Sequence, residues 1–348
     1  FFTYNKGLPL TIRSGFYPLI QDRAWGWFGH GIDTVAVLAT LFGLATSLGF
    51  GAQQAASGLH FLFDIPNTIN VQIAIICGVT AVAVFSVVRG LDGGVKVLSQ
   101  INMAMAALLL AFVFVVGPTG TIVGNILDTG ASYITTIVPL SNWIGREDEK
   151  FFHGWTVFYW AWWISWSPFV GMFIARVSRG RTVRQFIIAV LLVPTLVTLV
   201  WMAVFGGSAL YQVEADMGEL ADGLEDVSLA MFQMLDNLPL ASVTSFVAIC
   251  LVLVFFVTSS DSGSLVIDSI TAGGKIDVPV VQRIFWAVIE GVVAGVLLFG
   301  GGVDALGALQ AAAICVGLPF TVILLAMCLS LYLGLRHELA SERAAAAG

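Results

Sequence analysis

Eight apolar runs, each close to twenty residues or longer, constrain what this chain can fold into more than any other feature. They lie at roughly 33–62, 71–89, 98–117, 152–176, 184–210, 240–266, 281–300 and 305–333. A helix of about twenty apolar residues spans the core of a bilayer, whereas a membrane β-barrel shows shorter segments of alternating polarity. Only 11% of the residues are charged and the mean hydropathy is +0.94, so a water-soluble fold could not hide this apolar surface. We therefore predict an all-α polytopic membrane protein.

The basic residues predict which side of the membrane each loop faces. Thirteen of the 15 Lys and Arg residues fall at the two ends of the chain and in alternate loops, with the largest cluster at 176–184. Because cytoplasmic loops carry an excess of Lys and Arg, we place both ends of this chain in the cytoplasm and the protein in the cell (inner) membrane. The opposite loops include six acids from Glu214 to Asp226. This run is typical of a solvated outer surface, and an ion-attracting vestibule is the alternative.

We predict one transmembrane domain over residues 1–348. It has a cytoplasmic connector at 1–32, an amphipathic helix at the outer interface at about 126–143, and an external acidic loop at 211–239. The chain opens on Phe-Phe-Thr-Tyr-Asn-Lys without an initiator Met. That opening has the character of the end of an earlier helix, so we expect sequence upstream of it.

Residues 155–169 form the most unusual stretch, because they hold five of the ten tryptophans. At 100° per residue, Trp162, Trp166 and Phe169 lie on one helical face, with Trp163 beside it. Aromatic faces attract quaternary ammonium groups, which cannot donate hydrogen bonds. We favour a site for such a cation over the alternative, an aromatic belt at the membrane interface combined with packing.

The same stretch contains a Ser-X-Ser-Pro segment at 165–168. Pro168 removes one helical hydrogen bond and clashes with the carbonyl of residue 164, so we predict a broken helix here. The two serines are placed to re-satisfy freed backbone groups. We interpret Gly-Leu-Pro at 317–319 in the last run as a break or hinge of the same kind.

A second polar cluster lies at 258–264, with five hydroxyls and one carboxylate inside an apolar run. Polar groups at membrane depth are costly and are found at functional sites. A hard cation such as Na⁺ takes oxygen ligands, and the hydroxyls of Thr258 and Ser259 with the carbonyl of Phe255 are candidates. Hydrogen bonding between helices by Ser and Thr is the alternative.

Two further features stand inside the apolar runs. Gly43, Ser47 and Gly51 fall four residues apart and share one face, which favours close helix packing. Thr40 lies one turn earlier and offers an oxygen for an ion. Glu290 is an intramembrane carboxylate, either linked to proton movement or simply paired or near the interface.

The sequence lacks the patterns of an enzyme. Its four histidines lie near the ends of the runs without ligand spacing, and its four cysteines show no CxxC pattern. We therefore expect no catalytic residues and no cofactor. A channel, which would need a ring of polar side chains from several subunits, is a further alternative.

In four stretches the chain resembles the betaine/choline/carnitine transporter family. These are Leu8–Ser14, Phe42–Gly51, Trp155–Gly171 with its continuation at 175–181, and Val257–Gly263. The resemblance implies an inverted-repeat (LeuT-like) secondary transporter fold, with two five-helix repeats after two extra N-terminal helices. This chain would then begin at the end of the family's fourth helix and be N-terminally incomplete. Its runs 152–176 and 240–266 would be the eighth and tenth helices.

The resemblance also implies roles for the residues of the tryptophan stretch. Trp162, Trp163 and Trp166 would line a cage for a trimethylammonium group, and Phe169 would close the cytoplasmic side of that cage.

The implied ion sites lie on other runs. Thr258, Ser259 and the carbonyl of Phe255 match one Na⁺ site of the family, and Thr40 together with Phe169 matches a second. The sequence departs from the sodium-coupled pattern one turn after Thr40, where Leu44 replaces a hydroxyl residue. In this respect it is more similar to the choline carriers of the family, some of which are proton-coupled.

These features predict a secondary active symporter that imports choline or glycine betaine for osmoprotection, driven by a H⁺ or Na⁺ gradient. The alternative substrate is another zwitterion or amino acid, such as carnitine or a dimethylsulfonio compound. Expected partners are the lipid bilayer and a small quaternary-ammonium solute, with Na⁺ as the candidate coupling ion and no nucleic acid. The family resemblance implies a homotrimer.

Overall fold

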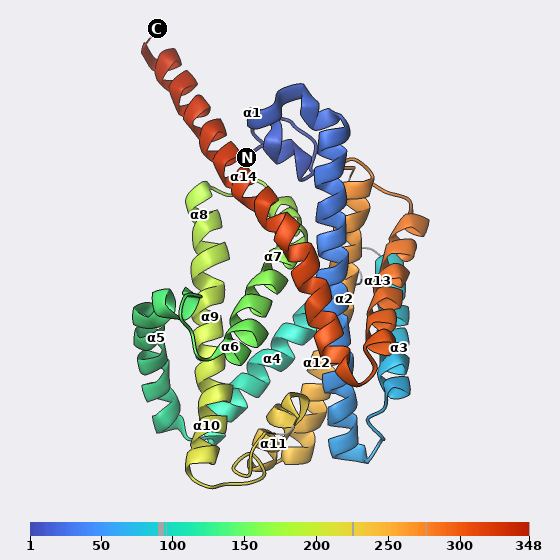
Figure 1. Cartoon of the computed structure of the whole chain (residues 1–348), viewed down its shortest axis with the longest axis vertical. Coiled ribbons are helices and arrows are strands. Elements are labelled where there is room, and N and C mark those ends of the chain that lie inside the picture. The colour runs from blue at the N-terminus through green and yellow to red at the C-terminus, as the bar shows by residue number, and fades with distance from the viewer. Residues whose placement is uncertain (90–93, 95, 225, 276, 348) are drawn as a thin grey trace. The chain divides into compact units, whose positions relative to one another are not determined.

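The computed structural model describes residues 1–89, 94, 96–224, 226–275 and 277–347 (Figure 1). All regular structure in these ranges is helical and contains no strand, which confirms the predicted all-α class. The long helices are α2 (Trp27–Phe63), α3 (Ile69–Arg89), α4 (Lys96–Val116), α5 (Thr119–Ser141), α7 (Phe158–Val177), α12 (Ala241–Thr271), α13 (Val280–Gly301) and α14 (Ala305–Ala347).

One further apolar run, 183–214, is a continuous series of α-turns and π-turns. Its parts are α8 (Val183–Ile187), the π-helix η5 (Ile188–Leu192), α9 (Val193–Trp201), the π-helix η6 (Met202–Gly206) and α10 (Gly207–Glu214). The π-turns widen the helix locally without ending it, so the run keeps the length that a membrane span requires.

Within the described ranges, seven helical segments are long and apolar enough to cross a membrane. They correspond to the predicted runs other than 152–176. That run is helical, because the π-helix η4 (Phe152–Val157) leads into α7. Its tryptophans, tyrosine and serines make it less apolar than the other seven, so the count of eight spans stays a prediction.

The first helix of membrane-spanning length begins earlier than predicted. Because α2 starts at Trp27, the connector is shorter than the predicted 1–32. This connector folds into short helical turns: η1 (Arg13–Phe16), α1 (Tyr17–Ile20) and η2 (Gln21–Trp25).

The two segments predicted on the outer side are partly helical. α5 covers most of the helix expected at 126–143, and its position at a membrane surface stays a prediction. The short helices η7 (Val227–Leu229) and α11 (Ala230–Asp236) lie in the loop expected at 211–239. One acid of that loop, Glu225, lies outside the described residues.

The chain divides into two compact units, each built from separate stretches of sequence. Unit 1 comprises Phe1–Ser47, His153–Arg179 and Ser259–Gly348, and unit 2 comprises Leu48–Phe152 and Gly180–Thr258. Both α2 and α12 contribute residues to each unit. The prediction of a single transporter domain is neither supported nor contradicted by this division.

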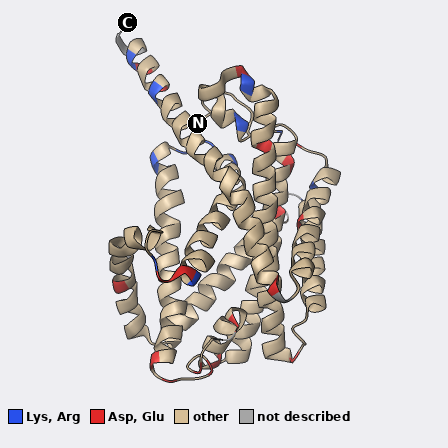
Figure 2. Ribbon diagram, viewed as in Figure 1, with Lys and Arg blue, Asp and Glu red and all other residues tan. Residues whose placement is uncertain are grey.

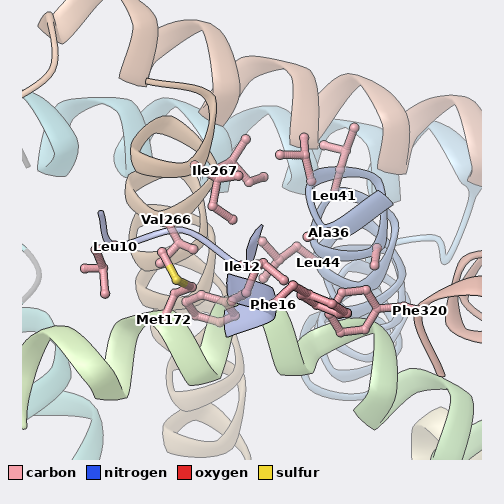
Figure 3. Close-up of a cluster of buried hydrophobic side chains, with 14 residues drawn as sticks. Leu10, Ile12, Phe16, Ala36, Leu41, Leu44, Met172, Val266, Ile267 and Phe320 are labelled. Atoms are coloured by element: carbon pink, nitrogen blue, oxygen red, sulfur yellow. The ribbon is translucent and has the colours of Figure 1, made fainter. Parts of the chain in front are cut away.

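Unit 1 has an apolar core that joins four helices and the connector. Phe16 of η1, Leu44 of α2, Met172 of α7, Ile267 of α12 and Phe320 of α14 are all buried in it, and Figure 3 shows these side chains gathered together. Burying each large apolar side chain stabilises the fold by about 1.5–3 kcal/mol. This core fixes α7 against the first part of α2.

Unit 2 has a core of its own around α11. Phe232 and Leu235 of that short helix are fully buried against Val113 of α4, Ile122 of α5 and Val204 of η6. The segment predicted as an external acidic loop, 211–239, therefore contains a helix whose apolar side chains belong to the core of unit 2.

Charged residues lie mainly in loops and at the ends of the long helices (Figure 2). Four acids of the described chain are buried instead: Asp33, Asp261, Asp268 and Glu290. Asp33 accepts from the backbone N–H of Arg13 at 3.0 Å, and Asp268 lies 3.1 Å from Arg283 Nε.

Candidate functional site

The predicted break in the tryptophan stretch does not occur, because α7 is continuous from Phe158 to Val177 with Pro168 inside it. Proline at 168 leaves the carbonyl of Ile164 without its helical N–H. The Ser167 hydroxyl donates to that carbonyl at 2.7 Å, and the Ser165 hydroxyl donates to the carbonyl of Trp162 at 2.7 Å. Ser167 thus replaces the hydrogen bond that the proline removes, and the helix continues through Pro168.

The break predicted at 317–319 does not occur either, whereas a hinge at that position stays a prediction. α14 is a single helix that runs through Pro319. Helices in apolar surroundings keep their hydrogen bonds wherever local geometry allows, because water is not there to replace them.

The aromatic residues of α7 form a continuous ladder along one face. Trp162 stacks on Phe158 with ring centroids 5.4 Å apart and meets Trp166 edge to face at 6.5 Å. Trp166 in turn meets Phe169 at 5.6 Å with an interplanar angle of 65°. This confirms that Trp162, Trp166 and Phe169 share a face, as the helical period predicts.

The two tryptophans of the ladder are anchored to one backbone carbonyl of α2. Trp166 Nε1 donates to Gly43 O at 2.9 Å, and Trp162 Nε1 donates to the same oxygen at 3.2 Å. Trp162 Nε1 also lies 3.2 Å from the hydroxyl oxygen of Ser47. Buried indole N–H groups need such acceptors, and with them satisfied the ladder presents ring faces and C–H edges only.

Gly43 is the residue that permits this anchoring. A Cβ at that position would lie 2.7 Å from Ser165 Oγ and 2.9 Å from Trp166 Cδ1. The small residues predicted to mediate close packing do so here. Gly51 plays a similar part within unit 2, where a Cβ would overlap the ring of Phe256.

The structure separates the four predicted cage residues. Trp162 and Trp166 are half-buried, whereas Phe169 is 6% exposed and belongs to the apolar core of unit 1. Trp163 is 67% exposed and points away from the ladder. It lines an open hollow of about 470 Å³ together with Tyr159, Trp160 and Ile164.

Two of the predicted ligands of the first sodium site are adjacent. The Thr258 hydroxyl donates to the carbonyl of Phe255 at 2.9 Å, which leaves the lone pairs of the threonine oxygen for another partner. Hydroxyl and carbonyl oxygens are of the type that a hard cation binds, and the sodium site stays a prediction. Ser259 is the next residue of α12 and is half-buried, and the boundary between the two units falls between it and Thr258.

The predicted second sodium site has one polar oxygen in place. Thr40 is fully buried and its hydroxyl oxygen has no hydrogen-bond partner among the described residues. Leu44, one turn later, packs against α12, because a Cβ on Gly263 would lie 2.1 Å from Leu44 Cδ1. Leu44 therefore makes an apolar contact at the position where the family resemblance places a hydroxyl, and the second sodium site stays a prediction.

Sequence reasoning missed two contacts that the fold creates. The first is the carbonyl of Gly43 as the shared acceptor of both indoles. The second is the hydrogen bond from Ser260 to Glu290, which joins α12 to α13 at 2.8 Å. In the sequence, Gly43 lies on a face of small residues and Ser260 lies next to the intramembrane acid Asp261. Neither pattern predicts which residue of another helix each one contacts.

The comparison with known families covers almost the whole chain. Residues 1–340 match the family described as BCCT, betaine/carnitine/choline family transporter. This result agrees with the helical architecture and with the seven helices of membrane-spanning length in the described chain, and it identifies a multi-pass membrane protein.

Several known proteins are similar over nearly the full length of this chain. Glycine betaine transporter 1 of Vibrio parahaemolyticus is 66% identical over 339 residues, which cover 97% of this chain and 65% of that protein. A glycine betaine/proline/choline/ectoine transporter of the same bacterium is 62% identical over 344 residues, 99% of this chain and 61% of that protein. The glycine betaine transporter OpuD of Bacillus subtilis is 43% identical, over 97% of this chain and 66% of OpuD.

The chain therefore spans slightly less than two thirds of the length of these relatives. On the family match and on these identities, the chain belongs to the BCCT family of betaine/carnitine/choline transporters, which have the LeuT-like inverted-repeat fold.

Proposed function

We propose that the protein is a secondary active symporter that imports a quaternary-ammonium solute, choline or glycine betaine, for osmoprotection. The aromatic ladder of α7 is the observation that carries this proposal. Trp162 and Trp166 commit their N–H groups to Gly43, so a ligand that reaches them meets aromatic carbon. One face of Trp162 is stacked on Phe158, which leaves the other face of that indole for a ligand. A quaternary ammonium group cannot donate hydrogen bonds, so ring faces are the matching surface, worth about 0.5–2 kcal/mol for each face.

The names of the relatives support the same class of solute. Those proteins are described as transporters of glycine betaine, and one name adds proline, choline and ectoine. A second candidate follows from that name: a carrier for a wider range of zwitterions, including amino acids without a quaternary nitrogen.

The gradient that drives uptake is H⁺ or Na⁺. Thr258, Ser259 and the carbonyl of Phe255 would hold one sodium ion, since Thr258 Oγ1 and Phe255 O are already adjacent. Thr40 with Phe169 would supply a second site only in part, because Leu44 adds no oxygen there. This set of ligands favours transport of one sodium ion with each solute, or coupling to protons without sodium.

The proposal also covers the orientation of the chain in the membrane and the oligomeric state of the protein. Both ends of this chain lie in the cytoplasm of the cell, on the side that carries 13 of the 15 Lys and Arg residues. The protein assembles as a homotrimer, as the family resemblance implies.

The test is uptake of labelled choline and glycine betaine by the full-length protein in liposomes. Uptake is measured against a concentration gradient, with Na⁺ replaced and with the proton gradient collapsed in separate experiments. Accumulation of glycine betaine, a zwitterion without net charge, supports the symporter and excludes a channel, which cannot move such a solute up its concentration gradient.

The site is tested by substrate binding to Trp166→Ala and Trp163→Ala. Removal of one ring face from a cation weakens binding by about 2- to 30-fold, and we expect this loss for Trp166→Ala. Trp143→Ala is the control, because that tryptophan is 73% exposed and lies outside α7. If Trp166→Ala and Trp163→Ala both bind choline and betaine as the parent does, the aromatic site is wrong.

A further inference from the structure

Glu290 is the one acid of α13, and it lies in the middle of the packed face of that helix. Its side chain is 1% exposed. The other buried residues of that face are Ala287, Gly291, Ala294 and Leu298. Small apolar residues let neighbouring helices approach closely, so water does not reach the carboxyl group by this face.

Among the described residues, the carboxyl group of Glu290 has one hydrogen-bond partner. Ser260 of α12, itself 4% exposed, donates its hydroxyl to Glu290 Oε2 at 2.8 Å. The second oxygen, Oε1, is buried and has no partner among the described residues. An ionised carboxylate offers about four acceptor sites, so in this environment the charged form would exchange its full hydration for a single hydroxyl.

The charged groups on α12 and α13 do not compensate a negative charge on Glu290. Asp261 of α12 is fully buried and repels a charge on Glu290. Arg283 lies two turns back on the same face of α13, about 10 Å along the axis. Its guanidinium is already engaged, since its Nε contacts Asp268 of α12 at 3.1 Å.

The other elements of unit 1 that pack near this face add no counter-charge. α14 has no acidic or basic residue from 305 to 335, and its Cys315, Cys328 and Tyr332 are exposed. The part of α2 from 34 to 47 has no charged residue either. At the far end of α13, the short helix η8 (Gly302–Asp304) brings only another acid, which is exposed.

We propose that Glu290 binds and releases the proton that is carried in the transport cycle, and that Ser260 positions its carboxyl group. This inference rests on the proposed function and specifies its coupling ion. The step adds one proton to a carboxylate oxygen and gives a neutral carboxylic acid, with no other bond made or broken. Burial as seen here favours the neutral acid. In a conformation that admits water between α12 and α13, the group ionises and the proton leaves.

A proton suits this site better than a metal cation does. Hard cations such as Ca²⁺ and Mg²⁺ take about six oxygen ligands or more, whereas one carboxyl and one hydroxyl converge here. Among the described residues, no group of three or more His, Cys, Asp or Glu side chains is placed to hold a metal ion. A proton needs only a single oxygen.

The test compares the full-length parent with Glu290→Gln in liposomes. Glutamine keeps the size and the hydrogen bond to Ser260 but cannot gain or lose a proton in this range of pH. With one proton moved per solute and the membrane potential held at zero, a gradient of one pH unit supports about tenfold accumulation of choline or betaine. We expect the parent to approach this accumulation and Glu290→Gln to equilibrate the solute without accumulating it.

Two controls separate a loss of coupling from a loss of folding. Exchange of labelled for unlabelled solute needs no gradient, and we expect Glu290→Gln to keep it. Glu342→Gln removes an exposed acid from the tail of α14 and should accumulate solute as the parent does. Ser260→Ala should still couple to protons, but at a shifted pH, because the carboxyl group loses its hydrogen bond.

Infrared spectroscopy gives a readout that is independent of transport. At neutral pH the parent should show the C=O stretch of a protonated carboxyl group, and Glu290→Gln should lack that band. The inference is overturned if the band is absent from the parent, or if Glu290→Gln still accumulates solute in a proton gradient. The inference also fails if uptake by the parent requires Na⁺ and does not depend on the proton gradient. That outcome would leave the proposed function intact. If the parent binds neither choline nor betaine, the proposed function itself fails.

Discussion

At the residue scale, Gly43 controls how the aromatic face of α7 is presented. Its carbonyl accepts from the indoles of Trp162 and Trp166, and its missing Cβ lets Ser165 and Trp166 approach the backbone of α2. The N–H edges of both indoles are therefore turned toward α2. A ligand that meets this face finds aromatic carbon, which favours a solute without N–H donors.

Gly43→Ala should therefore weaken both folding and binding. The new methyl group would lie within 3.0 Å of Ser165 Oγ and Trp166 Cδ1. Overpacking of this kind costs about 1–3 kcal/mol, and the displaced indole should bind choline more weakly. Thermal unfolding in detergent and a choline titration measure the two effects.

Gly31→Ala is the matched control on the same helix. A Cβ at Gly31 meets nothing within 4 Å, so alanine should stabilise α2 by about 0.5–1 kcal/mol through its higher helix propensity. Equal effects of the two substitutions would contradict the packing role of Gly43.

At the scale of the element, α7 is held closely on two sides. Gly43 of α2 packs against one side, and on another a Cβ at Gly317 of α14 would lie 2.9 Å from the carbonyl of Ala161. These close contacts lie along a helix that is continuous from Phe158 to Val177. The hydrogen bond from Ser167 to the carbonyl of Ile164 supplies that continuity next to Pro168.

The coupling between Ser167 and Pro168 can be measured in a double-mutant cycle. Ser167→Ala alone should destabilise the protein by about 0.5–1.5 kcal/mol, because the carbonyl of Ile164 loses its donor. In a Pro168→Ala background the backbone N–H of residue 168 serves that carbonyl, so the same substitution should cost much less. Chemical unfolding in detergent gives the four free energies.

Thr321→Ala is a useful comparison for this cycle. Its hydroxyl donates to the carbonyl of Gly317 at 2.8 Å, and that carbonyl is not four residues before a proline. We therefore expect Thr321→Ala to change the free energy of unfolding only slightly. If Ser167→Ala lowers the free energy of unfolding equally with and without Pro168, Ser167 does not compensate for the hydrogen bond that Pro168 removes.

At the scale of the whole molecule, the two units draw on stretches that alternate along the chain. Unit 1 takes the first, middle and last stretches, and unit 2 takes the two between them. α2 and α12 each contribute residues to both units. Rocking of one repeat against another is how inverted-repeat transporters expose a central site to each side in turn.

The predicted orientation can be tested by cysteine labelling in a background without the native cysteines. Ser341→Cys lies near the end of α14, and Asp222→Cys lies in the acidic loop. If both ends of the chain are cytoplasmic, a membrane-impermeant reagent should label position 222 in intact cells and position 341 only after the membrane is opened. The reverse pattern would invert the topology.

Part of the fold and of the site could be predicted because it depends on local properties of the chain. Run length predicts helices long enough to cross a bilayer, and the helical period places Trp162, Trp166 and Phe169 on one face. The continuity of α7 was missed although its cause is also local. The penalty of Pro168 was visible in the sequence, but its compensation depends on the rotamer that Ser167 adopts.

The sequence by itself determined the helical class, the apolar runs and the aromatic face, because each follows from residue type and spacing along one helix. Only the tertiary structure decided which partners the polar groups meet. Trp166 donates to a carbonyl 123 residues away, and Ser260 meets a carboxyl group 30 residues away. It also decided that Trp163 stays exposed while Phe169 enters the core. The physical reason is that burial and hydrogen bonding depend on neighbours from other helices, and no local sequence pattern predicts which residues these are.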